Sequence, residues 1–400
     1  MNKIEVLTGI DRLIEKSAIP LKNKKIGLIT NHTGITRKLK STIKALCEYG
    51  VNVRALFGPE HGINGNIQDA IPAPDSIEEK TGVKIYSMFG ANYWPTPKMV
   101  ADIDTLVYDM QDVGARFFTY IYTMAYCLAF AAKNNIQFIV LDRPNPVTGT
   151  HVEGALLEPS FRSFVGDYRL PFRYGLTPGE LALYLNRTQG WNANLEVIPL
   201  LGWRRELWFD ETNLPWVMPS PNLPTLETAV VYPGTALFEG TNISEGRGTT
   251  RPFELIGAPW LNAAKTIDAL YEGFESCGVE GVLLREAHFR PTFDKYMDTP
   301  CHGFQLHVTN REIYSPVAAG IICLKVIRDQ NPENFKWLKN PKALHQLQKG
   351  EIFMIDILAG TDALRNMIDQ GVFLKDLLDR MMGGVESFIE QSKFCHLYAM

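Results

Sequence analysis

A carboxylate and an imidazole stand side by side where an apolar segment ends. The mostly apolar residues 53–57 run into the turn Gly58-Pro59-Glu60-His61-Gly62. Glycine and proline end a strand, so this pattern is typical of a buried strand that brings acid and base groups to a loop at its carboxyl end. Glu60 is therefore the leading catalytic candidate. A turn with a solvated Glu and His is the alternative, which this stretch alone leaves equally open.

Other predicted strands also end in polar loops. Apolar segments at 25–30, 83–89, 105–110 and 137–142 lead into loops containing Asn31, Tyr93 with Trp94, Asp112 with Arg116, and Asn145. A predicted helix at 117–133 carries Tyr120. Ligands of parallel sheets bind outside the carboxyl ends of the strands. Several polar strand ends together favour a functional site over ordinary turns.

A second dense cluster occupies residues 238–253. Its polar side chains are interleaved with glycines, an arrangement that brings backbone N–H groups and a guanidinium group close to an anionic ligand. A flexible glycine loop is the alternative. The ligand-capable residues of the cluster are Asn242, Glu245, Arg247 and Thr249, and a proline-rich segment upstream adds Asn222.

The alternation of strands and helices predicts the fold class. Near-continuous apolar strands separated by helices indicate an α/β fold with a Rossmann-like, doubly wound and mainly parallel sheet. A change of pattern near 258–262 divides the chain into a domain at 1–260 and a smaller C-terminal α+β domain at 261–400. Strands are also expected at 229–233 and 351–358. No GxGxxG follows the first strand and no GxxxxGK[ST] is present, so the sequence does not support NAD or ATP as a cofactor.

Composition excludes several classes of protein. The net charge of −4 and the lack of a basic run argue against a nucleic-acid partner. No stretch of about 18 uninterrupted apolar residues occurs, so no membrane span is expected. The first residues lack the shape of a signal peptide, which predicts a cytoplasmic protein, or a periplasmic or secreted one if a leader has been removed. Scattered cysteines without a CxxC pair and the absence of HExxH predict no disulfide framework and no metal.

Five ordered motifs together resemble a known family. They are GPEHG (58–62), YDMQDVGARFFTY (108–120), LDRPNP (141–146), MPSPNLPT (218–225) and FEGTNISEGRGTTRPFELIGAP (238–259). In these motifs the chain is similar to the DUF1343 family, exo-β-N-acetylmuramidases of the NamZ type in glycoside hydrolase family 171. The resemblance runs from about residue 5 to near the C-terminus. It implies a Rossmann-like catalytic domain, a smaller αββαββ-type domain and a cleft between them.

The resemblance also implies a reaction, the release of N-acetylmuramic acid (MurNAc) from the non-reducing end of peptidoglycan fragments. Glycoside hydrolysis needs a proton donor for the leaving oxygen and a second group on the opposite face of the sugar. Glu60 is predicted to be the general acid and His61 to orient it or to bind the sugar. The candidates for the second group are Asp112, then Tyr120, then Glu245.

The remaining candidates are assigned to substrate binding. Guanidinium groups pair well with carboxylates, so Arg116 and Arg247 are predicted to bind the lactyl carboxylate that distinguishes MurNAc from N-acetylglucosamine (GlcNAc). Residues expected to hold hydroxyl or acetamido groups of muropeptides such as MurNAc-GlcNAc are Asn31, Asn145, Asn222, Asn242 and Thr249.

Two other functions remain open at this stage. A non-catalytic muropeptide-binding protein of the same fold would bind MurNAc without turning it over. A transferase that uses a nucleotide or a sugar phosphate would need a phosphate-binding loop, and no such motif is found. The sequence does not determine the oligomeric state or the stereochemical outcome of hydrolysis.

Overall fold

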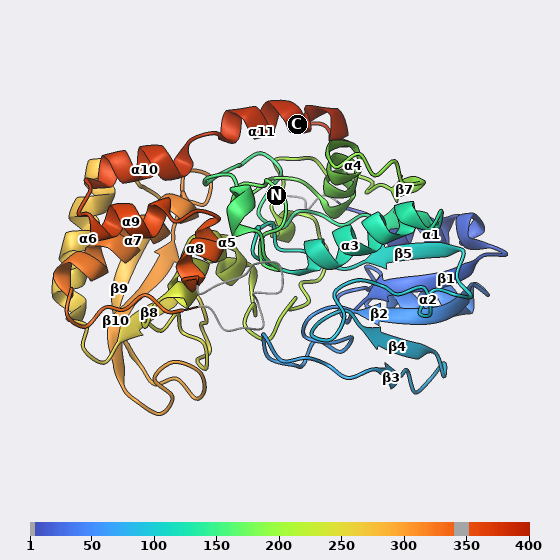
Figure 1. The fold of residues 1–400 in the computed structure, drawn as a ribbon, viewed down its shortest axis with the longest axis horizontal. Helices are drawn as coiled ribbons and strands as arrows, with labels where there is room; N and C mark the ends of the chain where they lie inside the picture. Colours follow the sequence, from blue (N-terminus) through green and yellow to red (C-terminus); the bar gives the residue numbers. More distant parts are fainter. Residues whose placement is uncertain (1–4, 340–351) are drawn as a thin grey trace.

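A seven-stranded sheet forms the centre of the N-terminal part of the chain. The computed structural model describes residues 5–339 and 352–400 (Figure 1). The strand order is β3-β4-β2-β1-β5-β6-β7, and all pairs are parallel except β3 with β4. The strands are β1 (Lys25–Thr30), β2 (Asn52–Gly58), β3 (Ser76–Ile77), β4 (Lys84–Ser87), β5 (Thr105–Asp109), β6 (Gln137–Leu141) and β7 (Leu195–Ile198).

Helices cover both faces of this sheet. On one face lie α1 (Gly9–Glu15) and α2 (Thr42–Glu48), and on the other α3 (Tyr120–Lys133) and α4 (Pro178–Thr188). Successive side chains of a strand point to opposite faces, and β5 shows this directly. Leu106 and Tyr108 join the core under α3, whereas Val107 joins the core under α1 and α2. Burial on both faces explains why the strands are almost continuously apolar, and it confirms the predicted α/β fold class.

The strand order reverses its direction at β1. This strand pairs with β2 on one side and with β5 on the other, so the chain moves outward both ways from it. In doubly wound sheets the crevice beside such a switch point, at the carboxyl ends of the strands, receives the ligand. The loops after β1, β2 and β5 therefore lie in the expected position for a site.

A smaller antiparallel sheet characterises the C-terminal part of the chain. Its order is β8-β10-β9, formed by β8 (Leu255–Ala258), β9 (Val282–Phe289) and β10 (Cys301–Val308). Figure 1 shows most of the helices of this part beside this sheet, whereas the last helix lies away from it. The helices are α5 (Leu226–Thr235), α6 (Ala263–Cys277), α7 (Pro316–Gln330), α8 (Met354–Ala359), α9 (Ala363–Asp369), α10 (Leu374–Met382) and α11 (Val385–Ser392). Short 3-10 helices lie at η1 (Ile19–Leu21), η2 (Pro159–Phe161), η3 (Phe209–Glu211), η4 (Ala236–Gly240) and η6 (Lys393–Cys395).

Two predicted strands are wrong. Residues 229–233 belong to the helix α5, and residues 354–358 belong to α8; residue 351 lies outside the described residues. The β-branched residues of α5 suggested a strand, but this helix is buried along most of its length and packs against α7. A Cβ at Gly234 would lie 1.8 Å from the Pro316 carbonyl oxygen, so the two helices are in close contact there. Tertiary packing overrides local propensity at such buried positions.

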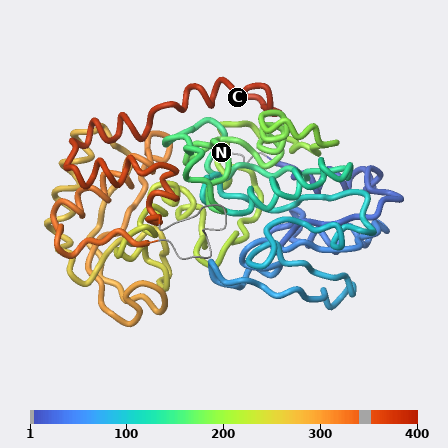
Figure 2. Tube along the Cα trace, in the orientation of Figure 1, coloured from blue at the N-terminus to red at the C-terminus, as the bar shows by residue number. Residues whose placement is uncertain are grey.

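The C-terminus returns to the N-terminal sheet. In Figures 1 and 2 the last helix crosses from the C-terminal part toward α4, and the chain ends there. The Leu397 N–H donates to Glu180 Oε1 at 2.9 Å, and the Tyr398 hydroxyl donates to the Asp142 carboxylate. These contacts tie the two parts of the chain together away from the strand-end crevice. The predicted domain boundary near residue 260 remains a prediction. Both β8 and α5 precede residue 260 in the sequence, and both pack with the C-terminal elements.

Candidate active site

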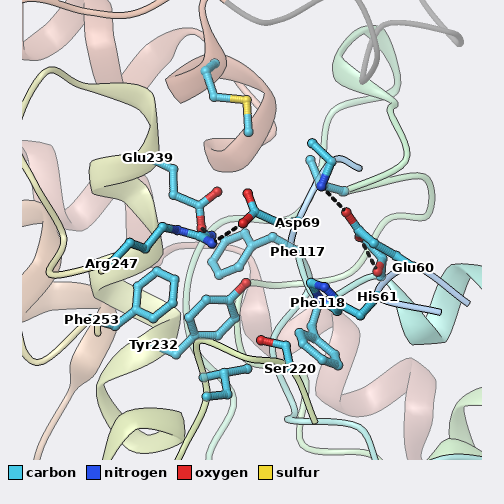
Figure 3. A pocket seen from close by; sticks show the side chains of 15 residues that line it. Glu60, His61, Asp69, Phe117, Phe118, Ser220, Tyr232, Glu239, Arg247 and Phe253 are labelled. Atoms are coloured by element: carbon cyan, nitrogen blue, oxygen red, sulfur yellow. Dashed lines mark hydrogen bonds and ion pairs between the residues drawn. The ribbon is translucent and has the colours of Figure 1, made fainter. Parts of the chain in front are cut away.

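A pocket lies where the loop after β2 meets the loops between α5 and β8. It has an empty volume of about 540 Å³, including space open to solvent. Figure 3 shows Glu60 and His61 on one side and Arg247, Glu239 and Phe253 on the other. The pocket is lined by Glu60, His61, Asp69, Ala70, Phe117, Phe118, Thr119, Val165, Ser220, Leu223, Tyr232, Glu239, Arg247, Phe253 and Met354. The strand-end loop and the glycine-rich cluster thus contribute to one site.

Glu60 is held by two hydrogen bonds. Its Oε1 accepts from the Ala70 N–H at 2.9 Å and its Oε2 from the Thr119 hydroxyl at 2.7 Å. Thr119 is the N-cap residue of α3, and the N-terminus of a helix favours negative charge nearby. An ionised carboxylate only accepts hydrogen bonds, so these two donors match the anionic form of Glu60. The carboxylate is buried and fixed in orientation at the edge of the pocket.

His61 is positioned by an unusual backbone conformation. Its φ angle is 69°, in the left-handed region that few residues other than glycine adopt readily. Nδ1 lies 2.8 Å from the Ile67 carbonyl oxygen, and the ring packs edge-on against Tyr120. A carbonyl oxygen only accepts, so Nδ1 carries a proton and donates this hydrogen bond. The turn predicted from Gly58 and Pro59 thus presents an oriented imidazole beside Glu60.

On the side of the pocket opposite Glu60, the guanidinium group of Arg247 forms ion pairs with three carboxylates. Arg247 Nη1 lies 2.5 Å from Asp69 Oδ1, Nη2 lies 2.9 Å from Glu239 Oε1, and Nε lies 3.0 Å from Glu245 Oε1. Lys295 Nζ adds a second cation, 2.8 Å from Glu245 Oε2. The surrounding carboxylates keep the pKa of Arg247 well above its ordinary value. Arg247 is therefore a permanent cation at the pocket wall.

Glu239 is the carboxyl group of this cluster with an altered acidity. Burial and the negative charges of Glu245 and Asp69 together raise the pKa of Glu239 to about 7, although Arg247 opposes the shift. Asp69 differs, because its side chain is 43% exposed and lies on the loop that follows β2. The pocket thus contains carboxyl groups in contrasting environments.

Aromatic rings form the wall between the two sides. Phe117 and Phe253 pack edge-on against Tyr232, with ring centroids 5.7 and 4.7 Å from it. Phe118 also lines the pocket. Burial raises the pKa of Tyr232 well above its ordinary value, so its hydroxyl stays protonated. Aromatic faces and a protonated hydroxyl group suit the apolar faces and polar edges of a sugar ring.

Asp112 does not line the pocket. Its Oδ2 accepts from the Gly114 N–H at 2.8 Å and from the Tyr174 hydroxyl. Burial raises the pKa of Asp112 to about 6. The structure places this carboxyl group inside the turn after β5, where it holds the backbone of that turn.

Tyr120 and Asn31 lie behind the pocket. The Tyr120 hydroxyl donates to the Pro219 carbonyl oxygen, and burial raises the pKa of Tyr120 well above its ordinary value. Asn31 Oδ1 accepts from the Thr33 N–H at 2.9 Å and from the Thr33 hydroxyl at 2.6 Å. Both side chains organise strand-end loops in this structure.

Arg116 is enclosed by backbone carbonyl groups. Its Nη1 donates to the Ala155 and Leu170 oxygens at 2.8 and 2.7 Å, and Nη2 donates to the Leu358 and Ala359 oxygens at 2.9 and 2.8 Å. Both terminal nitrogens are thus used to join the N-terminal part to α8. The structure does not bring Arg116 to the pocket.

The other predicted residues also make contacts outside the pocket lining. Each amide or hydroxyl group bonds to a neighbouring loop, and Glu245 pairs with Arg247 and Lys295. The partners are the Leu176 oxygen for Asn145, Gln68 Oε1 for Asn222, the Asn334 oxygen for Asn242 and the Gly246 oxygen for Thr249. Of the predicted set, the pocket lining includes Glu60, His61 and Arg247.

Sequence reasoning missed Asp69, Thr119 and Glu239. Glu239 stands in the FEG segment that opens the second cluster, and Thr119 stands beside Tyr120 in a motif that was recognised. Asp69 belongs to an irregular stretch without a local signal.

Among residues 5–339 and 352–400, no group of three or more His, Cys, Asp or Glu side chains is arranged to hold a metal ion. In the same residues no helix has both the length and the apolarity needed to cross a bilayer.

Comparison with protein families identifies the chain. Residues 26–227 match the model of the N-terminal part of the exo-β-N-acetylmuramidase NamZ, and residues 230–398 match the model of its C-terminal part. The chain belongs to the NamZ family. The resemblance inferred from its five motifs is therefore confirmed.

Individual NamZ relatives support the same assignment over the whole chain. The peptidoglycan β-N-acetylmuramidase NamZ of Bacillus subtilis strain 168 is 44% identical over 397 residues, which cover 99% of this chain and 92% of the relative. A crystal structure of a DUF1343 family protein from Bacteroides fragilis NCTC 9343 superposes with a TM-score of 0.88 at 34% identity, covering 99% of this chain and 100% of that chain. A second DUF1343 protein from the same strain gives a TM-score of 0.75 at 29% identity, with 99% of both chains covered.

Proposed function

We propose that this NamZ-family chain is an exo-acting β-N-acetylmuramidase. It is a glycoside hydrolase that releases MurNAc from the non-reducing end of peptidoglycan fragments such as MurNAc-GlcNAc. The observation that carries the proposal is that Glu60 and Arg247 line one pocket, in a chain that matches the family models over residues 26–227 and 230–398. A fixed carboxylate supplies the chemistry, and a permanent cation supplies recognition of an acidic sugar.

Arg247 is the proposed receptor for the lactyl carboxylate. It lines the pocket, and its planar guanidinium group can form paired hydrogen bonds with a carboxylate. In the structure Nη1 is paired with Asp69, whose side chain is partly exposed on a loop. The substrate carboxylate takes the place of Asp69 when the sugar binds. The aromatic wall of Phe117, Tyr232 and Phe253 then lies beside the sugar ring.

The test is a comparison of two disaccharides with opposite order. The purified chain is incubated with MurNAc-GlcNAc and with GlcNAc-MurNAc, and released monosaccharides are identified by mass spectrometry. Release of MurNAc from the first disaccharide alone is expected. Glu60→Gln should lose at least ~10²-fold in turnover while retaining the wild-type melting temperature. Release from neither disaccharide, or equal release from both, would contradict the proposal.

Binding without turnover distinguishes the alternative of a sugar-binding protein. That alternative predicts a saturable heat of binding for MurNAc-GlcNAc in calorimetry and no product after prolonged incubation. The buried and doubly hydrogen-bonded Glu60 favours the enzyme, because a binding site for a neutral sugar hydroxyl does not require a fixed anion.

A further inference from the structure

We propose that Glu239 is the proton donor to the glycosidic oxygen, with Glu60 acting as the carboxylate on the other side of the sugar. The inference rests on the proposed function and deepens it, because it assigns the second catalytic group. The sequence predicted Glu60 as the proton donor and Asp112, Tyr120 or Glu245 as the group on the opposite face, and none of the latter three lines the pocket. Glu239 lines it from η4, on the side opposite Glu60 (Figure 3).

The hydrogen bonds of the two carboxyl groups separate their roles. Glu60 uses both oxygens as acceptors, for the Ala70 N–H and the Thr119 hydroxyl. Glu239 Oε1 accepts from Arg247 Nη2 at 2.9 Å, and within the described residues its Oε2 has no hydrogen-bond partner. A general acid needs one oxygen free to carry and to deliver a proton. Glu239 meets this requirement and Glu60 does not.

The local charge balance places a proton on Glu239. Arg247 and Lys295 provide two positive charges, whereas Asp69, Glu239 and Glu245 provide three carboxyl groups. Glu245 contacts both cations and is the best-compensated anion. Asp69 is 43% exposed, so water stabilises its charge. Glu239 is left with one cationic contact in a partly buried position, and like charges that crowd one site keep one carboxyl group protonated.

Acidity supports this geometric reading. The groups whose charges act on Glu239 are Arg247, Glu245 and Asp69, and Glu239 in turn acts on Tyr232. Their balance with burial raises the pKa of Glu239 to about 7. Glu239 is therefore protonated below about pH 7 and can donate there. When the lactyl carboxylate replaces Asp69 on Arg247, one anion replaces another and the excess of negative charge is preserved.

The proton moves from Glu239 Oε2 to the glycosidic oxygen as the bond between that oxygen and C1 breaks. The bonding electron pair stays on the leaving oxygen, which departs as a GlcNAc hydroxyl group. Water supplies the hydroxyl group that C1 acquires and releases one proton, and this proton is returned to Glu239 by exchange through the solvent. The proton count of the enzyme is therefore unchanged after each turnover, and no cofactor is required.

The experiment uses two substrates that differ in their need for a proton. MurNAc-GlcNAc has a poor leaving group, whereas 4-nitrophenyl β-MurNAc releases a phenolate that leaves without protonation. Glu239→Gln should reduce kcat on the disaccharide by at least ~10²-fold and kcat on the nitrophenyl glycoside by less than ~10-fold. The fall of disaccharide kcat/KM above about pH 7 should also disappear in this variant. Glu60→Gln should lose activity on both substrates.

Glu245→Gln is the matched control, because it makes the same change beside the same guanidinium group but outside the pocket lining. At a pH well below 7, where Glu239 keeps its proton, Glu245→Gln should change the turnover of both substrates by the same factor. Glu239→Asp keeps a carboxyl group and should retain more disaccharide activity than Glu239→Gln if both variants fold, as judged by their melting curves. Equal losses on both substrates in Glu239→Gln, or full disaccharide activity in it, would overturn the assignment. If the wild-type chain hydrolyses neither substrate, the proposed function itself fails.

Discussion

Asp69 and Arg247 are ion-paired across the pocket at 2.5 Å, although 178 residues separate them in the chain. Asp69 lies on the loop after β2, and Arg247 lies in the glycine-rich segment before β8. The pair joins the two parts of the molecule at the place where the substrate carboxylate is proposed to bind. Its strength therefore affects how readily an acidic sugar enters.

Asp69→Asn should lower KM for MurNAc substrates. The variant removes the anion that competes for Arg247, and a partly exposed ion pair contributes up to about 1 kcal/mol, so a decrease of roughly 2- to 5-fold is expected. Steady-state kinetics with 4-nitrophenyl β-MurNAc measures it. Asp75→Asn is the control, since Asp75 lies on the same loop and bonds to the Ser87 N–H instead. An unchanged KM in Asp69→Asn would show that Asp69 does not occupy the carboxylate site.

Thr119→Val should reduce kcat by about 10-fold, because a hydrogen bond to a charged group contributes roughly 1.5–3 kcal/mol. The lost hydroxyl donates to Glu60 Oε2, whereas no side-chain capping bond of α3 is lost. Thr123→Val makes the same change one turn further along α3, where the buried hydroxyl has no partner in the described residues. Its activity should stay at the wild-type level, and Thr119→Ser should restore most of the loss. Equal kinetics of the two valine variants would argue against a positioning role for Thr119.

Arg116→Met should destabilise the fold without a specific effect on KM. Its four bonds to carbonyl groups are lost and the acceptors are left buried, so the free energy of unfolding should fall by about 3 kcal/mol or more. Urea unfolding at constant pH measures this. Arg204→Ala provides the comparison, since Arg204 forms an exposed pair with Glu206 and should change stability by less than about 0.5 kcal/mol. A large rise in KM with unchanged stability would instead support the substrate-binding role first predicted for Arg116.

Asp112→Asn should change how stability depends on pH. The folded pKa of Asp112 is raised from 3.8 to about 6, so the native state holds its proton more tightly than the unfolded chain does. This contribution is full below about pH 4 and is lost as the pH rises through about 6, up to roughly 3 kcal/mol for a shift of about two units. The stability of Asp112→Asn relative to the wild type should therefore improve from pH 4 to pH 8. Urea unfolding across this range tests it, and a parallel pH dependence of the two proteins would contradict the shift.

The sequence by itself determined the sheet, the family and one side of the pocket. Continuous apolar segments and the Gly and Pro residues that end them are local signals, so the strand ends were predicted close to where they lie. Glu60 and His61 follow β2 directly, and their place in the crevice depends only on that strand and its turn. Helix α5 shows the limit of local signals, because its β-branched residues are helical only through burial against α7.

Only the tertiary structure decided which polar residues share the pocket. Arg116 and Arg247 both stand in family motifs, yet one is enclosed by carbonyl groups and the other meets three carboxylates. Asp112 and Glu239 differ in the same way, since one holds its own turn and the other faces Glu60 across the pocket. A side chain's partners come from segments far apart in the chain, and its acidity follows from burial and nearby charge. Neither property is encoded in local spacing.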